Sequence, residues 1–196
     1  MSGMRRLVRQ DPLADSAALV RRVYAYVAYR IGDGPDAEDV AAEAFARAVR
    51  YRDSYDPSKG APIVWLIGIT RRCLDDARRE RALERDPPEA AAPGDLEDDS
   101  LNRLVLWDAV GQLDERDRHL IALRYGADLS AKEIGRQLGM KTNAVEVALH
   151  RAIGRLRPLL EEGPGERVPP RDTAVRIPPI PRYEGVEARP DRKRTR

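Results

Sequence analysis

One segment of the chain, residues 130–157, constrains the fold more than any other, because its pattern encodes two short amphipathic helices joined by a tight turn. Ser130 and Glu133 form an S-x-x-E capping box, the pattern that begins a helix. An apolar stripe follows at a spacing of four residues, with Ile134 and Leu138. Gly139 stands where a helix ends in the left-handed conformation, which glycine adopts without strain. The pattern predicts a first helix between Ser130 and Gly139.

The second helix of this hairpin has an apolar face and a polar face. Met140, Lys141 and Thr142 make the connection, and Asn143 is predicted to cap the helix with Glu146 at the reciprocal third position. The apolar stripe consists of Val145, Leu149, Ala152 and Leu156. The opposite face presents Glu146, Val147, His150, Arg151 and Arg155. Such a hairpin is a helix-turn-helix, whose second helix can lie in the major groove of DNA.

Cations outnumber acids along the hairpin, as contacts with DNA phosphates require. The cations are Lys132, Arg136, Lys141, Arg151, Arg155 and Arg157, and the acids are Glu133 and Glu146. The alternative interpretation is an ordinary helical hairpin whose polar side chains face water. Length, caps and stripes suit both interpretations, whereas the cationic excess and the short turn favour DNA.

Composition indicates a cytoplasmic protein with modest cores. The 196 residues allow one or two small domains, and 5% aromatic residues leave the interior to Leu, Val, Ile and Ala. The net charge of +2 is small, so nucleic-acid binding must come from where the charges lie. The longest apolar run, residues 61–69, is too short to cross a membrane, and the N-terminal residues lack the apolar stretch of a signal peptide.

Periodicity and composition divide the chain into four zones and predict an all-α fold. Residues 12–83 read as a first helical domain and residues 100–162 as a second one that ends in the helix-turn-helix. Residues 84–99 form an acidic, flexible linker, and the Pro- and Arg-rich residues 163–196 form a disordered tail. The helices predicted in the first domain are Ala17–Ile31, Ala37–Tyr51 and Ile63–Leu83.

Two charged surfaces of the first domain each allow two interpretations. Asp39, Glu43 and Arg47 stand four residues apart on one helix, where they can pair with one another in a solvated face or dock a partner helix. The third helix carries a basic surface of Arg71, Arg72, Arg78, Arg79 and Arg81. Neighbouring acids can balance these cations, and this interpretation is about as well supported by composition as DNA contact.

Two blocks of the chain together resemble the sigma factors of bacterial RNA polymerase of the extracytoplasmic-function type. The first block is Asp36-Ala-Glu-Asp39 with Glu43, Phe45 and Arg47, then Trp65-Leu66 with Ile69, Arg71, Asp76 and Arg79. The second runs from Leu113-Asp-Glu-Arg116 through Leu123-Arg-Tyr125, Leu129-Ser130, Glu133-Ile134, Leu138-Gly139 and Val145 to Leu149-His-Arg-Ala152. The hairpin alone occurs in many regulators, whereas both blocks in this order, over about residues 12–160, are specific.

The resemblance implies that the chain binds core RNA polymerase, directs it to promoter DNA and helps to open the duplex. It implies that Asp39, Glu43 and Arg47 bind a coiled coil of the polymerase. It assigns the minus-ten element to Tyr51, Arg52, Tyr55, Lys59, Arg71, Arg72, Arg78 and Arg79. Opened DNA needs cations along its backbone and an aromatic platform for an extruded base, although tyrosine is equally common as a packed core residue.

The resemblance also implies that the hairpin reads the minus-thirty-five element and that an anti-sigma factor is a further partner to consider. The hairpin residues concerned are Lys141, Thr142, Asn143, Glu146, Val147, His150, Arg151 and Arg155. The chain departs from the family at four positions. Ala42 stands where the family usually has glutamine, and Arg72 where it usually has asparagine. Glu146 and Val147 stand where the family often has basic or hydroxyl-bearing residues. Fewer cations should weaken phosphate binding, whereas Glu146 could accept from cytosine and Val147 could contact a thymine methyl group.

Other classes of function fit the sequence less well. The two histidines, His119 and His150, have no metal-ligand spacing, the single Cys73 excludes an intramolecular disulfide, and no phosphate-binding loop motif is present. We therefore expect no enzyme, no cofactor and no metal. The better alternative is a helix-turn-helix repressor or activator that binds a palindrome as a dimer, whereas a sigma factor acts as a monomer on an asymmetric promoter.

Overall fold

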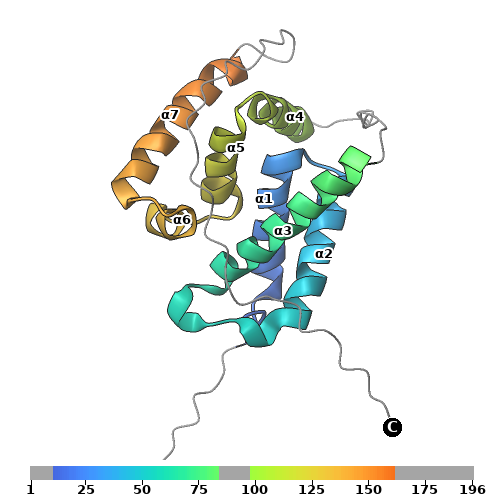
Figure 1. Ribbon diagram of the computed structural model, residues 1–196. Coiled ribbons are helices and arrows are strands. Elements are labelled where there is room, and N and C mark those ends of the chain that lie inside the picture. The colour runs from blue at the N-terminus through green and yellow to red at the C-terminus, as the bar shows by residue number, and fades with distance from the viewer. Residues whose placement is uncertain (1–10, 84–97, 162–196) are drawn as a thin grey trace, which may run out of the picture.

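The computed structural model of the protein describes residues 11–83 and 98–161, in which all regular elements are helical (Figure 1). The first domain contains α1 (Ser16–Ile31), α2 (Pro35–Tyr51), the short 3-10 turns η1 (Arg52–Ser54) and η2 (Pro57–Lys59), and α3 (Pro62–Leu83). The second contains α4 (Asp98–Gly111), α5 (Glu115–Ile121), the π-helical turn η3 (Ala122–Gly126), α6 (Ala131–Leu138) and α7 (Thr142–Glu161). The predicted all-α fold with two helical domains is confirmed.

The predicted linker and tail fall mainly outside this description. Residues 84–97 and 162–196 are not among the described residues, so the flexibility and disorder predicted for them stay predictions. The last two residues of the predicted linker, Asp98 and Asp99, belong to α4. Among the described helices, none combines the length and the apolar character that crossing a lipid bilayer requires.

The first domain is held together by a core of small and branched apolar side chains. Helix α2 contributes mainly alanines, which let it approach its neighbours closely. The buried residues of α1, α2 and α3 include Leu19, Val23, Tyr26, Val27, Ala37, Ala41, Ala44, Ala48, Ile63, Leu66, Ile67 and Leu74. Cys73 is buried beside them, as expected for a packed helical thiol, and burial raises its pKa.

The helix-turn-helix has the geometry that its sequence predicts. The backbone N–H of Ser130 donates to Glu133 Oε2 at 2.8 Å, and the N–H of Glu133 donates to Ser130 Oγ at 3.3 Å. Gly139 ends α6 in the left-handed conformation, with φ 65°. A Cβ atom on Gly135 would lie 2.6 Å from the carbonyl oxygen of Met140, so the turn needs glycine there. The predicted stripes, Ile134, Leu138, Val145, Leu149, Ala152 and Leu156, are all buried.

The predicted cap of the second hairpin helix is wrong. Helix α7 begins at Thr142, and the N–H of Val145 donates to the carbonyl oxygen of Lys141 at 3.1 Å. Asn143 therefore lies inside the first turn, and Lys141 takes the capping position. The turn after Gly139 is short enough that the helix starts two residues earlier than the capping pattern of Asn143 and Glu146 suggests.

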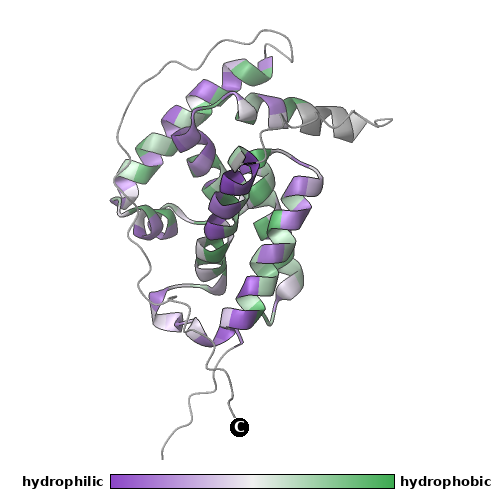
Figure 2. Ribbon diagram, turned by 45° about the vertical axis from the view of Figure 1, so that its right-hand side comes forward, coloured by the Kyte–Doolittle hydropathy of each residue, from purple (hydrophilic) through white to green (hydrophobic). Residues whose placement is uncertain are grey.

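A single hydrophobic cluster runs through both domains, which the sequence did not predict. Helix α1 packs against η3 and α5, and its buried residues Val23 and Tyr26 share one cluster with Leu120, Leu123 and Leu129 of the second domain. Figure 2 shows that apolar and polar residues alternate along the helices of both domains. A smaller cluster joins α4, α5 and α7 and touches Tyr29 of α1, whose ring meets Trp107 edge-on at 4.8 Å.

His119 of α5 lies inside this shared core as a neutral side chain. Burial lowers the pKa of its imidazole to about 3, and the positive charges of Arg30 on α1 and Arg71 on α3 act in the same direction. The hydroxyl of Tyr26 is 3.3 Å from His119 Nε2. A histidine with a lowered pKa disfavours the folded state at acid pH, because the unfolded chain binds the proton more readily.

Stability should therefore fall as the pH drops from about 6.5, the pKa of an unfolded histidine, towards about 3, by up to about 1.4 kcal/mol per pH unit. Replacing His119 by glutamine, which stays neutral, should remove the contribution of His119 to this dependence of the free energy of unfolding on pH. Urea unfolding of both proteins between pH 7 and pH 4.5 measures it, and the difference between the two slopes cancels the titration of carboxylates. Equal slopes would contradict a neutral, buried His119.

Candidate nucleic-acid and polymerase interface

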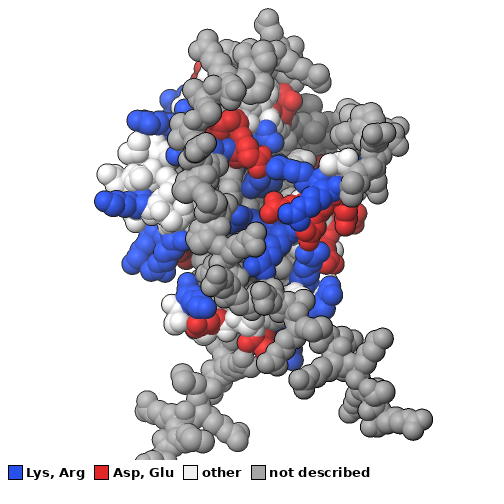
Figure 3. Space-filling model, viewed as in Figure 1, with Lys and Arg blue, Asp and Glu red and all other residues white. Residues whose placement is uncertain are grey.

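The exposed face of α7 collects most of the residues predicted to read duplex DNA. Val147 is 43% exposed and gives this face an apolar side chain. Other exposed side chains surround it: Lys141, Thr142, Asn143, Glu146, His150 and Arg151. Figure 3 shows lysine and arginine side chains over the part of the molecule where α6 and α7 lie. A groove-binding helix needs such a free face, with an apolar contact among polar and cationic groups.

Arg155, predicted as part of this face, is paired with a residue of α5 instead. Its Nε donates to Asp117 Oδ2 on α5, and this hydrogen bond raises the pKa of the guanidinium. The Asp117 side chain is 3% exposed and that of Arg155 is 54% exposed. The structure therefore gives Arg155 a role in joining α5 to α7. Sequence reasoning missed Asp117, because a single acid on a short helix has no distinguishing spacing.

The charged stripe of α2 has one residue bonded to a neighbouring helix, Arg47, and two acids that remain accessible to solvent. Arg47 donates to Glu43 Oε1 and to Asp76 Oδ2 of α3, both at 2.6 Å, and these two bonds raise its pKa. The pairing interpretation therefore applies to Arg47, which joins α2 to α3. The side chain of Glu43 remains 43% exposed, and Asp39 is exposed. These two acids are the members of the stripe that a partner protein can reach.

The segment assigned to the minus-ten element combines exposed cations with packed tyrosines. Arg52 and Lys59 are exposed, and Tyr51 is half-buried. The hydroxyl of Tyr55 donates to the carbonyl oxygen of Gly60 at 3.0 Å, and its ring lies 5.7 Å from that of Trp65. Burial raises the pKa of Tyr55. Tyr55 thus serves the local packing of the loop, and stacking of a base on Tyr51 or Tyr55 stays a prediction.

Acids neighbour several of the basic residues of α3. Arg79 Nη1 lies 3.2 Å from Asp76, and Arg78 Nη2 lies 3.2 Å from Glu115 of the second domain. Arg71 and Arg72 are half-buried. The balancing interpretation therefore applies to Arg78 and Arg79, and contact of this cationic surface (Figure 3) with DNA stays a prediction. No group of metal-ligating side chains occurs in the part of the chain that the structure describes.

Comparison with known proteins identifies both domains. The family described as "Sigma-70 region 2" matches residues 17–83, and "Sigma-70, region 4" matches residues 103–156. The ECF RNA polymerase sigma factor SigL of Mycobacterium tuberculosis is 30% identical over 165 residues, which cover 76% of this chain and 93% of SigL. CarQ of Myxococcus xanthus, an RNA polymerase sigma factor, is 34% identical over 149 residues, which cover 72% of this chain and 84% of CarQ.

Solved structures share the fold. The sigma factor RpoE from Bartonella quintana, in complex with the anti-sigma factor NepR, has a TM-score of 0.63 at 20% identity, and the match covers 75% of this chain and 94% of RpoE.

The two matched domains define the class of the protein, which is a sigma factor of the sigma-70 type. Within that class, the chain belongs to the ECF family, whose members recognise promoters and direct transcription initiation. A repressor or activator independent of polymerase is not favoured, because the first domain matches region 2.

Proposed function

We propose that the two domains divide the work of promoter recognition between them. The first domain binds core RNA polymerase through Asp39 and Glu43 and the minus-ten element through the surface of η1, η2 and α3. The second binds the minus-thirty-five element through α7. The observation that carries this division is the exposed face of α7 around Val147, on a chain whose first domain matches region 2. The protein acts in the cytoplasm, where core polymerase is found.

Transcription from a genomic DNA library with purified core polymerase tests this function directly. We expect the chain to bind core polymerase as a monomer and to start transcripts downstream of one recurring pair of asymmetric sequence elements. Core polymerase alone is the control. Binding of a palindrome by a dimer of the chain, together with no effect on polymerase, would overturn the proposal.

The α7 face also supports a proposal about which bases are read. Glu146 is exposed in the first turns of α7, the part of a recognition helix that contacts base edges. A carboxylate accepts from the amino group of cytosine, and the apolar Val147 suits the methyl group of thymine. Lys141 and Arg151 flank these two residues and can contact phosphate or guanine. A pyrimidine-containing element is therefore the target that this face fits.

Replacing Glu146 by glutamine should change the preferred base at one position of the minus-thirty-five element. Glutamine pairs with adenine, so the preference should move from cytosine to adenine by about 1–3 kcal/mol. Binding of the polymerase complex to a promoter library randomised at this element measures the change. Glu161→Gln, at the exposed end of the same helix, is the matched control. An unchanged base preference in Glu146→Gln would show that the residue reads no base.

A further inference from the structure

The chain contains two histidines, and the structure places them in opposite environments. His119 of α5 is 8% exposed and lies against Tyr26 of α1, with the centres of the two rings 6.1 Å apart. His150 of α7 is exposed. Histidine is the one type of side chain whose charge ordinarily changes between pH 5 and pH 8. A response of the protein to pH in this range therefore depends on which of the two rings can take up a proton.

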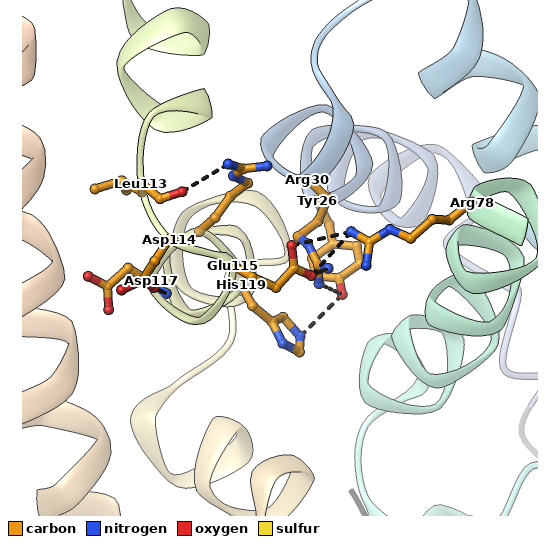
Figure 4. A network of polar contacts seen from close by, with 9 residues as sticks. Tyr26, Arg30, Arg78, Leu113, Asp114, Glu115, Asp117 and His119 are labelled. Atoms are coloured by element: carbon orange, nitrogen blue, oxygen red, sulfur yellow. Dashed lines mark hydrogen bonds and ion pairs between the residues drawn. The ribbon is translucent and has the colours of Figure 1, made fainter. Parts of the chain in front are cut away.

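His119 stays neutral over this range. Burial lowers the pKa of its imidazole to about 3. Figure 4 shows the ring beside the hydroxyl of Tyr26, on the side of α5 that faces the first domain. Near it, the carboxylate of Glu115 lies between the guanidinium groups of Arg30 and Arg78. No carboxylate is therefore left over on this side of α5 to hold a proton on the ring.

His150 lies on the face of α7 that we propose reads the minus-thirty-five element. It follows Glu146 by four residues, so the two side chains share one face of the helix, one turn apart. Arg151, the next residue, is exposed as well. The single cysteine, Cys73, is buried, and burial raises the pKa of its thiol. His150 is therefore the side chain through which a pH between 5 and 8 can change the charge of the protein.

The helices packed against α7 leave the ring of His150 available. These helices are α4, α5 and α6, whose described charged side chains are Asp108, Glu115, Arg116, Asp117, Arg118, Lys132, Glu133 and Arg136. Each carboxylate of this set accepts from a residue other than His150. Within residues 11–83 and 98–161, His150 itself has no hydrogen bond or ion pair. The acid closest to it along its own helix is Glu146.

Protonation changes what this imidazole can bind. The neutral ring has one donor and one acceptor, whereas the charged ring has two donors. Guanine presents two acceptors in the major groove, and phosphate oxygens are acceptors with a negative charge. Of the cations predicted for this face, Arg155 is bonded to Asp117, which leaves Lys141 and Arg151. One added positive charge is therefore a large change for this surface.

We propose that His150 binds promoter DNA in its protonated form, through an acceptor group of guanine or of a phosphate, and so makes recognition of the minus-thirty-five element dependent on pH. The inference rests on the proposed role of α7. The chain bound to DNA then holds more protons than the free chain, so its affinity for the promoter rises as the pH falls. Uptake of one proton changes the affinity by at most about tenfold per pH unit.

Two substitutions fix the charge of this side chain, and a third is their control. His150→Gln is neutral at every pH, and His150→Arg is always positive. His119→Gln removes the buried histidine and leaves the face of α7 unchanged. Each full chain is assembled with core polymerase, and binding is measured at pH 8 and pH 6 on a promoter selected with the unchanged chain. Because polymerase and DNA are common to all forms, a difference in pH dependence belongs to the substituted residue.

We expect the affinity of the unchanged chain to rise by about fivefold more than that of His150→Gln when the pH falls from 8 to 6. His119→Gln should behave like the unchanged chain, and His150→Arg should bind tightly at both pH values. Circular dichroism at both pH values checks that each form stays folded. If His119→Gln does not fold, the two His150 variants decide the result.

A promoter library randomised at the minus-thirty-five element separates the two DNA ligands. A preference for guanine at one position, present at pH 6 and constant in His150→Arg, would place the contact on a base. An equal gain for all sequences at pH 6, with a steeper salt dependence, would place it on a phosphate. Either result supports a contact made by the protonated ring.

Two results would overturn the inference and leave promoter recognition by the chain intact. The first is the same pH dependence in the unchanged chain and in His150→Gln. The second is weaker binding of the unchanged chain at pH 6, because the charged ring would then pair with Glu146 and withdraw it from DNA. If no form directs polymerase to a promoter at pH 8, the proposed function itself fails, and the role of His150 falls with it.

Discussion

Replacing Arg155 by alanine is expected to lower the free energy of unfolding by about 2–3 kcal/mol, although the residue lies on the helix assigned to DNA. Its partner Asp117 is buried, and removing the guanidinium would leave that carboxylate without its counter-charge. An unpaired buried charge is costly, whereas the partial exposure of Arg155 keeps the effect below that of a fully buried pair. Urea unfolding followed by circular dichroism measures the loss.

Arg151→Ala provides the matched comparison, because Arg151 is an exposed arginine one turn earlier on α7. This variant should keep its stability within about 0.5 kcal/mol, since exposed substitutions away from special contacts change little. It should instead weaken promoter binding by about 1–3 kcal/mol if Arg151 contacts a base, or reduce the salt dependence if it contacts phosphate. A stable Arg155→Ala protein with weakened promoter binding would show that Arg155 serves DNA, as the sequence pattern predicts.

Reversing the charges of Asp39 and Glu43 to lysine is expected to weaken binding to core polymerase by at least about tenfold. Juxtaposed like charges at an interface cost several kcal/mol, and both acids face outward from α2. The fold should survive, because Arg47 keeps its bond to Asp76 and exposed charge pairs contribute little to stability. Titration of labelled chain with core polymerase gives the affinity, and urea unfolding checks the stability.

A second double reversal, Glu80→Lys with Glu161→Lys, changes the net charge equally at two other exposed acids and serves as the control. It should bind core polymerase like the unchanged chain. Equal weakening in both double variants would mean that polymerase responds to net charge. Unchanged affinity in the Asp39 and Glu43 variant would exclude docking through this stripe.

Local features of the structure follow from local sequence. The capping box of Ser130 and Glu133, the left-handed Gly139 and the apolar stripes of α6 and α7 all occur as predicted. Each depends on residues within one or two helical turns, so the sequence around it contains the whole cause. The predicted cap at Asn143 is wrong because α7 already begins at Thr142, where the carbonyl oxygen of Lys141 accepts from the N–H of Val145.

Tertiary structure decided which charged residues remain available to partners. Arg151 and Arg155 are equivalent by pattern, yet Arg155 alone meets Asp117, an acid 38 residues away in the chain. Arg30 and Glu115 are separated by 85 residues, and their meeting depends on how α5 packs against α1. Helical periodicity assigns a side chain to a face of its own helix, whereas the partner across that face depends on packing between distant segments. The sequence determined the helices and the hairpin. The position of the two domains against each other depends on tertiary packing, in which Gly126 lies against Tyr26 and Glu115 lies between two arginines.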